Sequence, residues 1–409
     1  MNSVFDESFK NVYSEEIQVS SYYTYEEYDR EREKLFYLAL KLHKDFVLSS
    51  KAMHVNMRNL AKMWGMLENP DGEQYHFSPE DREAAFVHLF QSLFILVPVI
   101  STTFASVQSL LKDIKEHDQI GLLIVDEAGQ ASPQLAVGAL WRAKQAIIVG
   151  DPKQVEPVVT LPECVYAMLK DEFYQKYHKK TLSVQNFVDM LNTHSGKIEN
   201  TYLGEISTQW VGCPLTVHRR CIEPMFSISN EISYNGIMVN KTALPSEAEE
   251  KLFLHEKSCW IQSSGKEIGN RNHYVAEQGE LVLRMILEAF NRQQGLPDIY
   301  IISPFKYVAA EMKTLLGQNE KLNKYEGYDE WINTHCGTVH TFQGKEAKEV
   351  IFLLGCDESA SGAVKWVNSN IVNVAVTRAK YRLYVVGDYQ VWKKSRLFEI
   401  VKYNLEKNN

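Results

Sequence analysis

The stretch between residues 120 and 159 constrains the fold more than any other part of the chain, because apolar runs in it alternate with polar turns. Residues 122–125 are all aliphatic, which predicts a strand that is buried on both faces. The dipeptide Ser132-Pro133 indicates the start of a helix over residues 134–142, since a hydroxyl caps a helix and proline suits its first turn. Residues 146–149 predict a second buried strand. Strand, helix and strand in this order predict a parallel β-α-β unit.

Polar residues follow both of these strands directly. Asp126 and Glu127 come after the first strand, and Gly150, Asp151 and Pro152 come after the second. Ligands of open parallel sheets bind beyond the carboxyl ends of the strands, so the two clusters predict a ligand site at that edge. An acidic pair at a strand end is also common as a solvated turn, and the pair alone does not decide between these interpretations.

The composition is that of a soluble globular protein, with 45% hydrophobic and 23% charged residues among 409, and the length predicts two or three domains. The net charge of −8 provides no overall attraction to nucleic acid, so such binding would need a local basic groove. The six cysteines include no C-x-x-C pair, which argues against a zinc ribbon or a disulfide framework and favours the reducing cytoplasm. Residues 86–111 are too interrupted by polar residues and proline to span a membrane.

Residues 31–92 predict helices. Leu35, Leu38, Leu42 and Phe46 recur at helical spacing, which places them on one face of a helix. We interpret this segment as a helical packing domain, and the polar, tyrosine-rich residues before it as a lead-in.

Three further segments have local patterns of their own. Residues 96–100 predict a short buried strand, because the run is apolar and ends in serine and threonine. Residues 160–205 are expected to be mostly helical, and residues 215–238 are expected to be helical with interspersed aromatic residues.

The carboxyl-terminal part alternates helices with strands. Residues 277–292 and 305–316 predict helices, and residues 298–303, 350–354 and 383–386 predict strands. This alternation predicts a doubly wound α/β domain with a parallel core.

Six short motifs occur in order along the chain: DEAGQ (126–130), GDPKQ (150–154), HRRC (218–221), SPF (303–305), TFQGKE (341–346) and VAVTRAK (374–380). Each motif alone is weak evidence, whereas six in this order rarely occur by chance. The series resembles superfamily 1 helicases over roughly residues 96–390. It is most similar to the 5′-to-3′ branch that includes the nonsense-mediated-decay helicase and bacterial proteins known as AAA-domain or helicase-like proteins.

The resemblance implies an α/β fold of two RecA-like lobes of the P-loop NTPase type, with ATP in the cleft between them and single-stranded DNA or RNA across the top. It divides this chain into a lead-in over residues 1–30, a helical segment over 31–92 that is part of a family insertion, a partial first lobe over 93–205 and a second lobe over 206–409. The implied function is that of an ATP-dependent helicase or translocase.

The resemblance also implies roles around the nucleotide. Asp126 would hold Mg²⁺, often through water, since this hard cation prefers oxygen ligands. Glu127 would orient and deprotonate the attacking water. Gln154 would sense the γ-phosphate of ATP and couple it to the nucleic-acid site.

The second lobe would supply positive charge to the cleft. Arg220 and Arg378 match the two family arginines that reach the phosphates, a role that suits a planar, always-charged guanidinium. Arg219 leaves open which of the two neighbouring arginines faces the cleft. Gln343 and Glu346 would link the nucleotide to the strand, with Glu346 accepting hydrogen bonds from ribose hydroxyls.

Three threonines are expected at the nucleic acid. Thr102, Thr103 and Thr338 occupy family positions that touch the sugar-phosphate backbone, where hydroxyl groups make contacts that do not depend on sequence. Phe104 and Phe305 could stack on bases, or could belong to the core beside their strands.

The phosphate-binding pattern G-x-x-x-x-G-K-[ST] does not occur in the 409 residues. In the family this loop lies well upstream of DEAG, so we expect the chain to be the carboxyl-terminal part of a longer helicase. Three functions stay open: an ATP-driven helicase or translocase that is active when an upstream polypeptide supplies the loop in trans, a non-catalytic module that binds single strands or a protein partner, and a broken gene product without function.

Overall fold

The computed structural model describes residues 26–158, 164, 182–200, 207–269 and 272–407. Most of the predicted lead-in and most of the predicted helical stretch over residues 160–205 lie outside these residues. The chain divides into two compact units: unit 1 is built from residues within 1–150 and 158–184, and unit 2 from residues within 151–157 and 185–409. The predicted domain boundaries at residues 30, 92 and 205 stay predictions.

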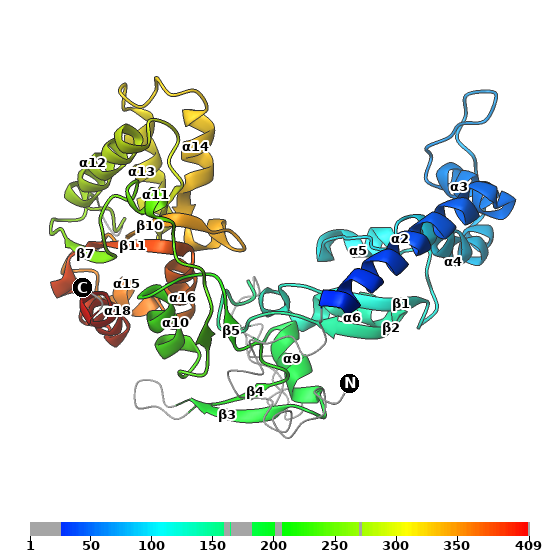
Figure 1. Ribbon diagram of the computed structural model, residues 1–409, viewed down its shortest axis with the longest axis horizontal. Helices are drawn as coiled ribbons and strands as arrows, with labels where there is room; N and C mark the ends of the chain where they lie inside the picture. Colours follow the sequence, from blue (N-terminus) through cyan, green and yellow to red (C-terminus); the bar gives the residue numbers. More distant parts are fainter. Residues whose placement is uncertain (1–25, 159–163, 165–181, 201–206, 270–271, 408–409) are drawn as a thin grey trace. The chain divides into compact units, whose positions relative to one another are not determined.

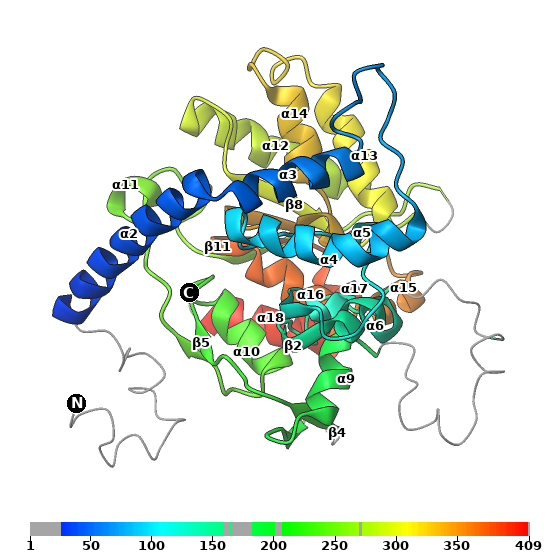
Figure 2. The same cartoon turned by 90° about the vertical axis from the view of Figure 1, so that its right-hand side faces the viewer.

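Unit 1 begins with helices, as predicted. They are α2 (Glu26–Ser49), α3 (Lys51–Met63), α4 (Pro79–Leu96) and α5 (Phe104–Leu110). Ser78 caps α4, because its Oγ accepts a hydrogen bond from Asp81 N at 3.0 Å, and proline follows at the first helical position. The helices α3 and α4 lie side by side (Figure 2) around Leu60, Phe86 and Phe90. None of the helices in the described residues is both long and apolar enough to cross a membrane.

Helix α2 differs from the packing domain that we expected. None of its residues is buried within the described part of the chain. The residues that recur at helical spacing are exposed, with Leu35 at 68%, Leu38 at 61%, Leu42 at 73% and Phe46 at 51%. The periodicity therefore predicted the helix correctly, but it did not predict what the apolar face contacts.

The predicted β-α-β unit is present in unit 1. Strand β1 (Ile120–Val125), helix α6 (Pro133–Arg142) and strand β2 (Ala143–Ile148) follow one another, and the two strands are parallel, with Ile124 beside Ile147. The prediction that both faces are buried was wrong. Leu122 is 48% and Ile124 is 58% exposed, because the sheet has two strands and no other described element of unit 1 covers this face.

Two local predictions next to this unit were also wrong. Residues 97–103 form neither helix nor strand: α4 continues to Leu96, Pro98 has no N–H for a sheet, and no described strand pairs with the segment. Ser132 precedes α6 as expected, but its hydroxyl makes no capping hydrogen bond. The proline that follows starts the helix without that cap, since its φ is already helical.

Unit 2 is organised around the predicted parallel sheet. Its five strands have the order β7-β11-β10-β8-β9, and all neighbouring strands are parallel. They are β7 (Cys259–Gln262), β8 (Ile299–Ser303), β9 (Cys336–Thr338), β10 (Ala347–Leu353) and β11 (Ala379–Gly387). The predicted strands over residues 298–303, 350–354 and 383–386 are three of these, so the α/β fold class is confirmed.

Helices cover both faces of this sheet. Figure 1 shows α12, α13 and α14 on one side and α10, α16 and α18 on the other. Their bounds, with those of the shorter α15 and α17, are α10 (Met225–Ser233), α12 (Ala276–Gln293), α13 (Lys306–Gly317), α14 (Tyr328–His335), α15 (Ser361–Trp366), α16 (Ser369–Thr377), α17 (Tyr389–Trp392) and α18 (Arg396–Lys407). The predicted helices over residues 277–292 and 305–316 are α12 and α13. The sheet is buried on both sides, as its continuous apolar strands require.

The segment before this sheet contains smaller elements. They are α9 (Val184–Leu191), the antiparallel pair β3 (Gly196–Asn200) and β4 (Ser207–Val211), the parallel pair β5 (Val217–His218) and β6 (Val239–Asn240), and α11 (Glu247–Glu250). The prediction of a helix over residues 215–238 was largely wrong, since only α10 is helical there. Pro224 explains this result, because the residue before a proline is disfavoured in the helical region and α10 begins only after it.

Glu349 makes the stability of unit 2 depend on pH. Its carboxylate is fully buried in β10 and accepts hydrogen bonds from Tyr384 Oη at 2.6 Å and Leu254 N at 2.9 Å. Burial raises the pKa of Glu349 from 4.5 to about 7. Between these values the folded state binds more protons than the unfolded state, so the free energy of unfolding falls as the pH rises.

We expect Glu349→Gln to remove this dependence. Between about pH 5 and about pH 8, the wild type should lose up to about 3 kcal/mol more stability than the variant, because glutamine cannot ionise. Urea unfolding of both proteins at the two pH values measures this difference. Equal losses would show that Glu349 ionises normally in the folded state.

Candidate functional site

The acidic pair of unit 1 lies in a tight turn after β1. Glu127 has a left-handed backbone conformation with φ of 53°, and its N–H donates to Asp126 Oδ1 at 2.9 Å. Gln130, at the end of the short helix η3 (Ala128–Gln130), donates from Nε2 to Glu127 Oε2 at 2.8 Å. Both carboxylates are exposed. Local hydrogen bonds therefore orient them while an approaching ligand can still reach them.

This turn is anchored to the end of β2. Ala128 N–H donates to Val149 O at 2.9 Å, and Val149 N–H donates to Val125 O at 2.8 Å. A Cβ atom on Gly150 would lie 2.5 Å from the backbone nitrogen of Gly129, so the approach requires glycine. The DEAGQ motif and the glycine of the GDPKQ motif are thus adjacent, as expected for successive turns at the carboxyl edge of a parallel sheet.

Asp151 joins several polar residues within unit 2. Its Oδ1 accepts from Lys153 N at 2.8 Å, and its Oδ2 accepts from Gln154 Nε2 at 3.0 Å and from the hydroxyl of Tyr234. Asn373 Nδ2 donates to Tyr234 Oη at 3.1 Å and to the Lys153 carbonyl at 3.0 Å. Burial and the neighbouring Asp151 carboxylate raise the pKa of Tyr234, so its hydroxyl keeps the proton that it donates.

Arg378 lies at the end of α16 and contacts two of the other motifs. Its side chain is fully buried. Nη1 donates to the Lys345 carbonyl at 2.8 Å, and Nη2 donates to Gln154 Oε1 at 3.2 Å. The structure therefore brings together Gln154 and Arg378, two of the residues predicted from the sequence, and places the TFQGKE motif beside the same guanidinium.

Arg220 lies in the same part of unit 2. Burial raises the pKa of the Cys221 thiol, and the positive charges of Arg220 and Arg378 both oppose that shift. Burial, assisted by Arg220, lowers the pKa of His218 to about 4. Arg219 is exposed, whereas Arg220 is half-buried. Of the two neighbouring arginines, Arg220 is thus the one that lies near the Cys221 thiol and the region of Arg378.

Gln343 and Glu346 flank the loop that Arg378 contacts. Gln343 follows the short helix η5 (Val339–Phe342) and is half-buried, and its Nε2 has no hydrogen-bond partner within the described residues. Glu346 is exposed. Burial is the main reason that the pKa of the Cys221 thiol is raised, and the negative charges of Glu223 and Glu346 add smaller contributions. Gln343 Nε2 can therefore donate a hydrogen bond to a ligand at this position, and the exposed carboxylate of Glu346 can accept one.

The three predicted threonines belong to different units. Thr102 and Thr103 are exposed in unit 1, where Thr103 precedes α5 without capping it through its side chain. Thr338 is half-buried at the end of β9 in unit 2, and its Oγ1 lies 3.1 Å from Thr341 Oγ1. The roles assigned to the predicted site residues stay predictions, as does the common cleft.

Sequence reasoning missed three residues of these surroundings. Asn373 had a usable signal, because an amide within an apolar helical run is expected to be buried with hydrogen-bond partners. The structure shows that it is fully buried. Tyr234 had no signal, because nothing local relates it to Asp151, 83 residues earlier. Trp366, which lines a hollow of unit 2 together with Thr338, was overlooked as an aromatic residue between motifs, and it is 54% exposed.

Comparisons with known proteins agree with this arrangement of motifs. Family models with the description AAA domain match residues 81–161 and residues 201–390. The DNA replication ATP-dependent helicase/nuclease DNA2 of Gallus gallus is 24% identical over 310 residues, which cover 73% of this chain. The chain belongs to superfamily 1 of the helicases.

Other similar relatives include nonsense-decay proteins, the group named in the predicted resemblance. Regulator of nonsense transcripts 1 of Dictyostelium discoideum is 20% identical over 86% of the chain, and the ATP-dependent helicase upf1 of Schizosaccharomyces pombe is 24% identical over 68%. The matches cover only 26%, 24% and 27% of the lengths of these three relatives. The chain thus spans about a quarter of the length of each of these three relatives.

Among solved structures, arterivirus nonstructural protein 10, a helicase, is similar to this superfamily 1 chain. Its complex with DNA has a TM-score of 0.32 and 13% sequence identity, and covers 67% of this chain and 41% of that one. This similarity is too low to locate individual residues of the site.

Proposed function

We propose that this chain supplies hydrolytic and sensing residues to an ATP-dependent helicase or translocase that acts on single-stranded nucleic acid. The hydrogen bond between Arg378 and Gln154 carries the proposal, because it joins two motifs that are 224 residues apart. Phosphoryl transfer is catalysed mainly by positioning and by neutralising charge, which a guanidinium fork beside a polar sensor provides. The ATP-dependent helicases among the relatives support the same reaction.

The acidic pair fits its share of this reaction. Asp126 Oδ1 accepts a hydrogen bond from Glu127 N, and no described residue occupies Oδ2, so an oxygen ligand is available for Mg²⁺. When bound, Mg²⁺ neutralises charge on the phosphate oxygens. Gln130 holds one carboxylate oxygen of Glu127 and leaves the other to accept a proton from the attacking water.

The β- and γ-phosphates lack their usual cradle in this sequence. Backbone N–H groups and the lysine of the phosphate-binding loop normally grip these phosphates, and the loop pattern does not occur in the 409 residues. Asp126, Glu127 and the two arginines act on a nucleotide that is already held. A polypeptide that carries the loop must therefore be supplied for turnover.

Unit 1 has a surface suited to such a polypeptide. Leu122, Ile124 and Ile147 are 48%, 58% and 50% exposed, and Ile124 and Ile147 lie side by side on adjacent strands. Within the described residues, β1 pairs only with β2, so the outer edges of both strands can accept another strand. We propose that the loop-bearing polypeptide adds a strand to this sheet and covers its apolar face.

Single-stranded DNA or RNA is the proposed partner. One relative is named as a DNA replication helicase and another as a regulator of nonsense transcripts, so the names of relatives support both kinds of strand. Thr102, Thr103 and Thr338 are the proposed contacts to its backbone.

The function is tested by measuring ATP hydrolysis with and without a single strand. The chain is mixed with the polypeptide encoded immediately upstream of the Met1 codon, if that frame encodes a phosphate-binding loop, or with a loop-bearing fragment of a relative. Hydrolysis that the strand stimulates supports the proposal. A mixture that forms a complex but does not hydrolyse ATP would favour the non-catalytic alternative.

The same assay separates the two neighbouring arginines. We expect Arg220→Ala to reduce hydrolysis by ~10³-fold or more, because an arginine that stabilises the phosphates contributes about that much. Arg219→Ala should leave the rate within about twofold, since Arg219 is exposed. If Arg219→Ala reduced hydrolysis more than Arg220→Ala, Arg219 would be the arginine that contacts the phosphates.

A further inference from the structure

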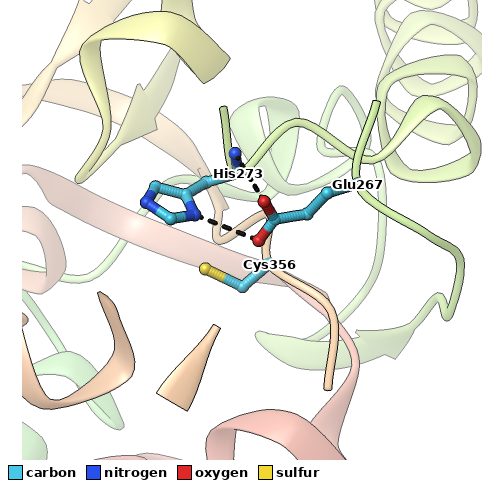
Figure 3. A group of neighbouring side chains, drawn as sticks. All are labelled: Glu267, His273 and Cys356. Carbon is cyan, nitrogen blue, oxygen red and sulfur yellow. Dashed lines mark hydrogen bonds and ion pairs between the residues drawn. The ribbon is translucent and has the colours of Figure 1, made fainter. Parts of the chain in front are cut away.

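Three side chains of unit 2 that suit a metal ion lie close together. Glu267 and His273 belong to the loop between β7 and α12, and Cys356 follows β10. Each residue offers one ligand atom, and these atoms lie within 4.8 Å of one another. Figure 3 shows the carboxylate, the imidazole ring and the sulfur turned toward one another. None of the six sequence motifs includes any of the three residues.

Hydrogen bonds hold these groups in place. His273 N donates to Glu267 Oε2 at 3.1 Å, and His273 Nδ1 lies 3.0 Å from Glu267 Oε1. Asp357 Oδ2 accepts from Glu267 N at 3.1 Å. Cys356 N donates to the His273 carbonyl at 2.8 Å, which joins the loop to the end of β10. The groups are therefore ordered before a ligand arrives, so binding costs little conformational entropy.

Two of the three residues have an unusual backbone conformation. The φ angle is 60° at His273 and 67° at Cys356, in the left-handed region that few residues other than glycine adopt. A Cβ atom on Gly355 would lie 2.1 Å from the His273 carbonyl oxygen, so the close approach of the two segments requires glycine there. Sparsely populated backbone conformations concentrate at functional sites, where the surrounding structure maintains them.

The Cys356 thiol has no hydrogen-bond partner among the described residues, although Cys356 is only 1% exposed. Its sulfur points toward the imidazole and the carboxylate (Figure 3). The side chain of Glu267 is 7% exposed, whereas that of His273 is 23% exposed. The cluster thus contains a buried sulfur without a partner and is open to solvent on the side of His273.

We propose that Glu267, His273 and Cys356 bind one Zn²⁺ ion, which fastens the loop before α12 to the end of β10. Zinc takes thiolate, imidazole and carboxylate ligands, whereas Mg²⁺ and Ca²⁺ prefer oxygen. Its usual bond lengths in a tetrahedral site separate the ligand atoms by about 3.4–3.6 Å. The pair at 3.0 Å would open slightly, and the sulfur would move on the order of 1 Å.

The proton balance of this step is simple. Zinc replaces the thiol proton of Cys356 and the proton that His273 Nδ1 shares with Glu267, and both protons leave to solvent. Water completes the fourth position of the ion on the exposed side of the cluster.

Metal titrations of the complete chain test the site without ATP or nucleic acid, so the result is independent of the proposed function. Cys164 and Cys213 are first replaced by serine, because both are exposed and free thiols bind metals on their own. This chain should bind one Zn²⁺ in calorimetry, and zinc should raise its melting temperature. Co²⁺ in place of zinc should give the absorption bands of a tetrahedral complex with a thiolate ligand.

Variants in the same background locate the ion. Cys356→Ala and Glu267→Gln should each weaken zinc binding by about 100-fold or more, since even residues that only support a metal ligand contribute about 10–100-fold. Cys356→Ala should also abolish the thiolate-to-cobalt band. Cys336→Ala is the matched control, because Cys336 is as deeply buried in unit 2 but lies outside the cluster, and it should leave binding and the spectrum unchanged.

Each outcome decides for or against the site. Failure of the chain to bind zinc, absence of the thiolate band with cobalt, or equal zinc binding by Cys356→Ala would refute it. If Cys356→Ala does not fold, Glu267→Gln decides, because glutamine retains an oxygen for the hydrogen bond from His273 N. Loss of zinc binding in Glu267→Gln, with unchanged thermal unfolding in the presence of a chelator, would establish the site, and normal binding would refute it.

Discussion

Glu127→Gln is expected to lower ATP hydrolysis by ~10²–10⁴-fold in a mixture of this chain with a loop-bearing polypeptide, because glutamine cannot accept the proton of the attacking water. The geometry of the turn should survive the change. Glu127 receives its hydrogen bond from Gln130 through a single oxygen, and the glutamine side chain retains an oxygen that can accept it. Binding of ATP to the mixture should therefore stay within a few-fold of wild type, and a steady-state assay alongside a binding assay measures both quantities.

The isolated chain provides the control for this experiment. We expect it to bind ATP poorly and to hydrolyse it negligibly, since nothing in its sequence replaces the phosphate-binding loop. Weak binding of single strands should persist. Robust hydrolysis by the purified chain alone, stimulated by a strand, would contradict this view and would mean that another segment holds the phosphates.

The second large effect is expected for Arg378→Lys, which should reduce hydrolysis in the same mixture by ~10³-fold. Lysine keeps the positive charge, but it cannot span the Lys345 carbonyl and Gln154 Oε1 with two N–H groups, as Arg378 does at 2.8 and 3.2 Å. The γ-phosphate would therefore lose both an oriented donor and its link to Gln154. Rates at saturating ATP measure the effect.

Because Arg378 is fully buried, its substitution needs a control for folding. Gln154→Ala removes the same hydrogen bond by changing the other partner, which is only half-buried. This variant should also slow strand-stimulated hydrolysis, while the thermal unfolding of unit 2 stays close to that of the wild type. Normal hydrolysis by both variants would show that the contact is structural and has no part in the reaction. A loss in Arg378→Lys alone, together with a lower melting temperature, would point to the same conclusion.

Local chemistry predicted much of the fold correctly. The strands of the second sheet are continuous apolar runs, and α12 and α13 have helical periodicity, so both kinds of element could be recognised without knowing their neighbours. Two of the failures concern single segments. Residues 96–100 have the apolar character of a strand, but α4 extends to Leu96 and no described strand pairs with the residues after it. Pro224 delays the helix expected from residue 215.

Burial could not be predicted for the central β-α-β unit. Leu122 and Ile124 have the composition of a strand covered on both faces, yet they are exposed in unit 1. The apolar face of α2 is exposed for the same reason. A sequence pattern reports that a face is apolar, and only the surrounding structure decides whether something covers it.

The sequence by itself determined the family, through the order of six motifs along the chain. It also determined the α/β class and the position of the acidic pair at a strand end, because these depend on residue types at short spacings. Only the tertiary structure decided that Arg378 contacts Gln154, that Tyr234 and Asn373 hold the Asp151 loop, and that Trp366 faces a hollow beside Thr338. These contacts join residues as much as 224 positions apart in the chain. Their geometry depends on the order in which parallel strands pair and on the helices that return between them, and no local spacing records that order.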